Sequence, residues 1–94
     1  MFDVTRTEAG HIVFQGRLDA YQADKARKAL DAVVESCIID FSELAYISSA
    51  GLGILLATQK RLNESGHALA ITRMNRHIRE VFHIAGFDLV FTIE

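Results

Sequence analysis

The feature that most restricts the fold is an alternation of helix-like and strand-like stretches. Apolar residues recur every three or four positions from Ala23 to Val34, from the serines at 48 and 49 to Gly66, and between Asn75 and Gly86. Short apolar runs follow each stretch, at residues 37–41, 67–72 and 89–93. Helices that alternate with short strands favour right-handed crossovers and a mostly parallel sheet.

Two further strands precede this alternation. Residues 2–8 alternate apolar and polar, residues 11–18 do the same, and Ala9-Gly10 forms the turn of a predicted hairpin. Asp19 is placed to cap the first helix. The predicted order is β-β-α-β-α-β-α-β: a single α/β domain over residues 1–94, with a mostly parallel five-stranded sheet and an antiparallel edge strand.

The run "CIIDF" at residues 37–41 is short and continuously apolar, a pattern typical of a central strand buried on both faces. The chain then passes through a polar bend before the serines. Asp19 and Asp40 are expected to end neighbouring strands and to lie near the serines. Asp40 is expected to orient the bend by accepting backbone hydrogen bonds.

Composition excludes several classes of function. The formal net charge of −2 over 94 residues gives no general attraction to nucleic acid or anionic membrane. No apolar run approaches the ~18 residues that span a bilayer, and the first ten residues do not resemble a secretion signal. The single cysteine, Cys37, permits no disulfide within the chain and reads as a small buried apolar residue. We expect a cytoplasmic monomer that binds neither nucleic acid nor membrane.

The stretch "DFSELAYISSAGLGILL", residues 40–56, places two serines and two glycines at a helix start. A serine cap contributes about 1 kcal/mol to helix stability. Gly51 and Gly53 each cost roughly 1 kcal/mol relative to alanine. They are explained if backbone closely approaches another part of the fold or a partner. The carboxyl ends of parallel strands are the usual functional edge of such sheets.

Catalytic and cofactor motifs are missing from this stretch. No lysine follows it as a phosphate-binding loop requires, and Ile47 stands where a Gly-x-Ser-x-Gly elbow has glycine. The four histidines are scattered, without metal-ligand or triad spacing. We therefore expect no catalytic residue, no cofactor and no metal site. A serine at a helix N-terminus does suit phosphorylation, because the helix dipole and free N–H groups favour the added charge.

The same stretch resembles the signature of STAS domains, the anti-sigma-factor antagonist family. That signature reads Asp-Leu-Ser, a spacer, an aromatic residue, then Asp-Ser-Ser/Thr-Gly-Leu-Gly. "GRLDA" at residues 16–20 resembles the Gly-x-Leu-Asp segment of the family, and the predicted order of elements agrees over nearly the whole chain. Two positions depart from the signature, since Ser48 replaces the aspartate and Ala50 replaces the second hydroxyl residue.

The resemblance implies a regulatory binding protein rather than an enzyme. The unphosphorylated protein would bind an anti-sigma factor that is also a serine kinase, and so free a sigma factor or other effector. Phosphorylation at the position of Ser49 would end the binding, and a metal-dependent serine phosphatase would restore it. The surface for the partner would comprise Asp19, Ser48, Ser49, Ala50, Gly51, Leu52 and Gly53.

Some alternatives stay open at this stage. Either serine can be the helix cap, with Ser48 the preferred cap and Ser49 the preferred phosphate acceptor. Of Leu52 and Ile54, one is expected to be exposed for docking. Arg73, Arg76 and Arg79 form either a solvated face or a basic contact patch. As a whole, the chain can instead be a STAS scaffold or accessory subunit of a transport or lipid-trafficking complex. A small nucleotide-binding protein is a third candidate.

Overall fold

The computed structural model describes residues 1–94 and has the predicted order of elements. The elements are β1 (Phe2–Arg6), β2 (Ile12–Leu18), α1 (Ala23–Asp31), β3 (Cys37–Ile47), α2 (Ser49–Glu64), β4 (Leu69–Thr72), α3 (Arg76–Ile84), the 3₁₀ turn η1 (Phe87–Leu89) and β5 (Thr92–Ile93). The strands form one sheet in the order β1-β2-β3-β4-β5. β1 pairs antiparallel with β2 and all other pairs are parallel, which confirms the predicted fold class.

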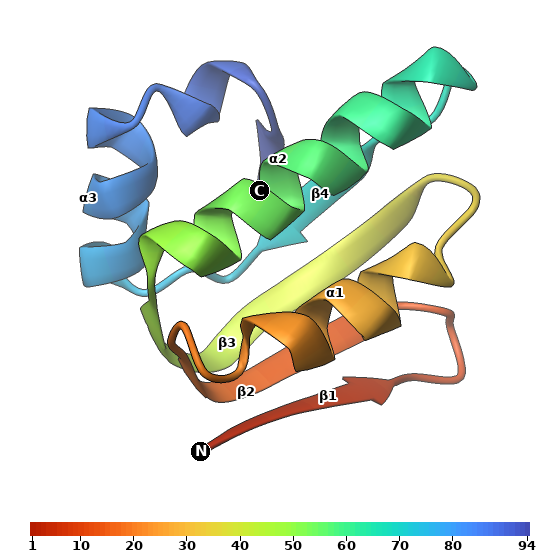
Figure 1. The fold of residues 1–94 in the computed structure, drawn as a ribbon. Coiled ribbons are helices and arrows are strands. Elements are labelled where there is room, and N and C mark those ends of the chain that lie inside the picture. Colours follow the sequence, from red (N-terminus) through yellow and green to blue (C-terminus); the bar gives the residue numbers. More distant parts are fainter.

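The helices cover one face of the sheet only. Each new parallel strand is added on the same side of the last one, so right-handed crossovers carry the connecting helices over the same face. Figure 1 shows α1 and α2 side by side over that face. Alternate residues of the strands, such as Phe14, Ile39 and Ile71, are fully buried there, whereas Ile38 and Asp40 on the other face are half-buried. The prediction of a central strand buried on both faces is therefore wrong.

A row of phenylalanines links the sheet to the C-terminal elements. Ring centroids lie 5.1 Å apart for Phe2 and Phe14, 5.7 Å for Phe14 and Phe41, and 6.1 Å for Phe41 and Phe82. Phe82 then contacts Phe91 at 5.9 Å. These separations suit favourable aromatic pairs. The row runs from the edge strand β1 across the sheet to α3, so it places α3 on the core.

β3 is longer than predicted because the polar segment is a bulge and not a bend between elements. Its buried positions change spacing from two residues to three, at Phe41, Leu44 and Ile47. The register against β2 shifts at two points, so β3 accommodates extra residues while these side chains still point into the core. The Asp40 carboxylate accepts the Ser42 N–H at 2.8 Å, and the Asn75 amide donates to the Leu44 carbonyl at 3.0 Å.

Several smaller expectations need correction. The N-cap of α1 is Gln22 and not Asp19, because a turn separates β2 from the helix. α1 ends at Asp31, so Val34, which the apolar periodicity places on this helix, lies outside it and is exposed. The fifth strand is only Thr92–Ile93, since the preceding residues form η1. Helix termini at Asn75, Gly66 and Gly86 are confirmed: the Asn75 side chain caps α3, and both glycines have positive φ.

Candidate functional site

The serine pair lies at the carboxyl edge of the sheet, where β3 passes directly into α2. The Ser48 N–H donates to the Leu18 carbonyl at 2.8 Å, which ties this junction to the end of β2. The Ser48 hydroxyl accepts the Gly51 N–H at 3.3 Å and is the N-cap of α2. The preference for Ser48 as the cap is therefore confirmed.

Ser49 differs from its neighbour in both exposure and bonding. It is the first residue of α2, is exposed, and its hydroxyl makes no hydrogen bond within the protein. The N–H groups of Ser49 and Ala50 also have no acceptor in the fold, as expected for the first turn of a helix. The first turn contains no acidic residue. An accessible hydroxyl thus lies beside free amides at the positive end of the α2 dipole.

The two glycines of this turn have different roles. A Cβ on Gly51 would lie 2.8 Å from Leu18 Cγ and 3.0 Å from Ile47 Cγ1, and both of these side chains are buried. Gly51 therefore lets α2 pack closely on the ends of β2 and β3. Gly53 is exposed, and a Cβ there would meet nothing within 4 Å. The fold therefore gives no steric reason for glycine at position 53.

Apolar side chains continue this surface only in part. Ala50 is exposed, while Leu52 and Ile54 are both half-buried and pack against the core. The expectation that one of Leu52 and Ile54 is exposed is wrong, because their positions flank the buried stripe of the helix on either side. The surface offered at this edge is thus shallow and made of small residues, with partial access to Leu52.

The two aspartates expected beside the serines are separated by the structure. Asp19 follows β2 at the same edge, and its carboxylate accepts the N–H groups of Tyr21 and Gln22 at 3.0 and 3.1 Å. It organises the turn before α1. Asp40 lies within β3, seven residues before its end, which is roughly 23 Å along an extended strand. Asp40 is therefore not part of this site, and the prediction that placed it there is wrong.

No candidate metal site forms elsewhere in the chain. No group of three histidine, cysteine, aspartate or glutamate side chains is close enough to hold a metal ion. Cys37 is half-buried, and burial raises the pKa of its thiol, which lowers its reactivity at neutral pH. No helix is both long and apolar enough to cross a membrane.

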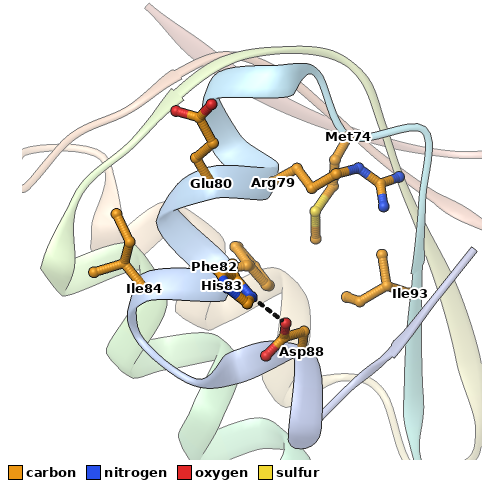
Figure 2. Close-up of a pocket in the computed structure, with 8 residues that line it drawn as sticks. All are labelled: Met74, Arg79, Glu80, Phe82, His83, Ile84, Asp88 and Ile93. Atoms are coloured by element: carbon orange, nitrogen blue, oxygen red, sulfur yellow. Dashed lines mark hydrogen bonds and ion pairs between the residues drawn. The ribbon is translucent and has the colours of Figure 1, made fainter.

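Sequence reasoning missed a cleft beside α3. Its volume is about 600 Å³, and Met74, Arg79, Phe82, His83, Asp88 and Ile93 are among the residues that line it. His83 Nδ1 and Asp88 Oδ2 lie 2.7 Å apart at its rim (Figure 2), and the hydrogen bond to Asp88 raises the pKa of His83. Of the three arginines predicted as a face or patch, Arg79 alone lines this cleft, and all three are exposed.

A family model described as "Mlab, STAS domain" matches residues 2–92. The chain belongs to the STAS-domain family. Among its relatives, BtrV of Bordetella bronchiseptica, which carries the provisional name of anti-sigma factor antagonist, is 34% identical over 83 residues; the match covers 84% of this chain and 72% of BtrV. The anti-sigma-B factor antagonist of Listeria monocytogenes is 30% identical over 87 residues, which cover 88% of this chain and 76% of that protein.

Solved structures share the fold of this STAS domain. An anti-sigma factor antagonist from Mycobacterium paratuberculosis superposes with a TM-score of 0.82 at 24% identity, covering 99% of this chain and 83% of that one. The antagonist SpoIIAA superposes in its unphosphorylated form with a TM-score of 0.73 at 17% identity, covering 100% of this chain and 87% of that one. Its phosphorylated form gives 0.72 at 18% identity, covering 100% and 91%. The fold is therefore the same in a phosphorylated and an unphosphorylated protein.

Proposed function

We propose that this STAS domain is an anti-sigma factor antagonist whose binding is switched by phosphorylation of Ser49. In its unphosphorylated form it binds an anti-sigma factor that is also a serine kinase, and so releases a sigma factor or another effector. The names of its relatives support the class of function. The assignment to Ser49 rests on the different roles of the two serines at the start of α2. Ser48 caps the helix, whereas the Ser49 hydroxyl is exposed and makes no hydrogen bond.

The binding surface in this proposal is the carboxyl edge around the first turn of α2. It comprises Asp19 and the continuous segment Ser48, Ser49, Ala50, Gly51, Leu52 and Gly53. Within it, Gly53 leaves room for the backbone of a partner, and Gly51 sets how deeply the helix sits on the sheet. The other residues of this surface are shallow, so a partner can reach Ser49 directly.

Phosphorylation closes this surface by charge and by volume. The kinase transfers the γ-phosphoryl group of ATP to Ser49 Oγ, the hydroxyl proton is lost, and ADP leaves. The product carries about −1.5 to −2 charges at neutral pH. Free amides of the first turn and the helix dipole stabilise that charge, so the fold tolerates it. A partner that packs against Ala50 and Gly53 would have to desolvate it, which opposes binding. A metal-dependent serine phosphatase removes the group.

The uncharged Ser48 changes this switch relative to the family signature. An aspartate next to the acceptor would add a negative charge both before and after phosphorylation. With Ser48, the unmodified edge has no carboxylate in the first turn of α2. The unmodified surface therefore carries one negative charge fewer beside Ser49 than the family signature would give it.

The test is phosphotransfer with the purified kinase-type anti-sigma factor and ATP. We expect one phosphate per chain, located at Ser49 by peptide mass spectrometry. Ser49→Ala should take no phosphate and keep binding the kinase, whereas Ser49→Glu should bind more weakly. Ser48→Ala is the matched control, since it loses the cap and about 1 kcal/mol of stability but keeps the acceptor.

Two results would contradict the proposal. One is phosphate at a residue other than Ser49. The other is Ser49→Ala protein that ATP still releases from the kinase. If the wild-type chain instead recovers a transporter ATPase and no kinase, the accessory-subunit function is the correct one.

A further inference from the structure

The cleft beside α3 is separate from the serine edge and is built from other elements. α3 and η1 form one wall, and residues from the ends of β4 and β5 form the other. Figure 2 shows Met74 and Ile93 on the strand side, facing Phe82, His83 and Asp88 on the helix side. Its volume of about 600 Å³ lies within the range of roughly 300–1,000 Å³ that is usual for small-molecule sites.

The floor of the cleft is apolar. Met74 and Phe82 are buried members of the core, and Ile93 is half-buried against it. Met74 is an unbranched, adaptable side chain, which suits a surface that must fit a flexible apolar group. The floor offers a ligand hydrocarbon contact and almost no hydrogen bonding.

Charges around the cleft are paired, with one exception. Asp88 is held by His83 at 2.7 Å, and Glu80 lies 3.7 Å from Arg76 on the outer side of α3. The Arg79 guanidinium has neither a hydrogen bond nor an ion pair in the protein. In Figure 2 it extends over the strand side, beside Met74 and above Ile93, whereas Glu80 and Ile84 point away from these two residues.

Helical spacing explains why a cation and an apolar floor meet here. Arg79 and Phe82 are three residues apart, and His83 follows one position later, so all three lie on neighbouring positions of one helix face. Phe82 turns into the core while Arg79 reaches past it towards β5. The result is an unpaired guanidinium above a hydrocarbon surface.

We propose that this cleft binds a small amphiphilic carboxylate, with its apolar chain against Met74, Phe82 and Ile93 and its carboxylate on Arg79. A planar guanidinium recognises a carboxylate through two parallel N–H···O bonds, and no protein carboxylate occupies those donors. A neutral apolar molecule would leave Arg79 unused, and a cationic one would be repelled by it. The proposal concerns a different surface from Ser49 and does not depend on the switch there.

The experiment is a titration of the whole chain with decanoate below its micelle-forming concentration, followed by methyl NMR signals. We expect saturable, one-to-one shifts of the Met74 and Ile93 methyl groups. Arg79→Gln should weaken binding roughly tenfold, the effect of one charged hydrogen-bonding group. Arg76→Gln removes the same charge from the same helix but lies outside the cleft, so it should change the affinity less than twofold. The wild-type chain should bind decanol about as weakly as the Arg79→Gln variant binds decanoate.

Each alternative outcome is decisive. Shifts that do not saturate, or that avoid Met74 and Ile93, would show that the cleft is not a binding site. Equal affinity for decanol and decanoate would show that no carboxylate is recognised. Equal losses in the two arginine variants would assign the effect to net charge instead of to Arg79. Because the Arg79 side chain is exposed and makes no contact that holds the fold, its variant should retain the wild-type melting temperature, which the same samples report.

Discussion

The two ends of α2 are built in opposite ways. At its start, Ser49, Ala50 and Gly53 are exposed, and a single side-chain cap of 3.3 Å closes the first turn. In its last two turns, Gln59 is 3% exposed and bonds two other segments: its amide donates to the Val90 carbonyl at 2.9 Å and its oxygen accepts the Leu69 N–H at 2.7 Å. Arg61 donates to the carbonyls of Leu30 and Val33 at 2.9 and 2.8 Å.

The difference shows how one helix can serve both stability and recognition. The second half of α2 fixes the helix to β4, to the segment before β5 and to the end of α1. The first turn then needs few contacts of its own, and its free amides and small side chains stay accessible. Substitutions in the second half should therefore change stability, and substitutions in the exposed part of the first half should change binding.

The largest expected effect is at Gln59. Gln59→Leu keeps the volume but leaves the Leu69 N–H and the Val90 carbonyl without partners, which should cost about 3 kcal/mol of unfolding free energy. Urea denaturation measures the loss. Gln15→Leu is the control, because Gln15 bonds only the exposed Glu43 side chain and should change stability by less than about 0.5 kcal/mol. A stable Gln59→Leu protein would contradict the contrast between the two ends.

The next largest effects should distinguish Gly51 from Gly53, the two glycines in the first half of α2. Gly51→Ala should destabilise the fold by about 1–3 kcal/mol, because its methyl group would overlap the buried Leu18 and Ile47. Gly53→Ala should stabilise the free protein by up to about 1 kcal/mol, since nothing lies near and alanine favours the helix. The same methyl group should weaken binding to the kinase-type partner. Thermal melts and titrations with that partner check both; unchanged partner affinity in Gly53→Ala would remove Gly53 from the binding surface.

Much of this arrangement could be predicted from local sequence signals. The caps at Ser48 and Asn75 and the terminating glycines at 66 and 86 are set by backbone needs within a few residues, so their chemistry is visible in sequence. The order of elements follows from the same signals. The cap at Ser48 could be predicted in the same way, and it leaves the neighbouring Ser49 exposed, whereas phosphorylation of Ser49 stays a prediction.

The remaining features depend on partners distant in sequence. The extension of β3 past Asp40 needs a bulge whose carbonyl is satisfied by Asn75, 31 residues after Leu44. Gln59 reads as an ordinary polar helix residue until β4 and Val90 surround it. The cleft at Arg79 forms only when β5 closes beside α3. In each case the role of a polar group depends on segments that only the folded chain brings together, which no local pattern records.

The smallest expected effect concerns the ion pair between His83 and Asp88. This pair attaches η1 to α3, next to the Val90 segment that Gln59 binds. His83 and Asp88 join α3 to η1 at the exposed surface, and Asp88 raises the pKa of His83 above its usual 6.5. A raised pKa in the folded state means that this contact stabilises the protein fully below pH 6.5 and less as the pH rises through the folded-state pKa. An NMR titration of the His83 ring should therefore give a midpoint above 6.5, and Asp88→Asn should lower it.

Because both side chains are well exposed, water screens the pair, and Asp88→Asn should change stability far less than Gln59→Leu. The comparison tests whether a buried neutral amide or an exposed ion pair fixes η1 against the domain. Asp88→Asn could instead increase hydrogen exchange in the Val90 segment as strongly as Gln59→Leu does. The ion pair would then be the main attachment of η1, and this would contradict the role given to Gln59 in the second half of α2. We expect exchange of the Phe91 N–H, which bonds the Phe87 carbonyl, to rise strongly only in Gln59→Leu.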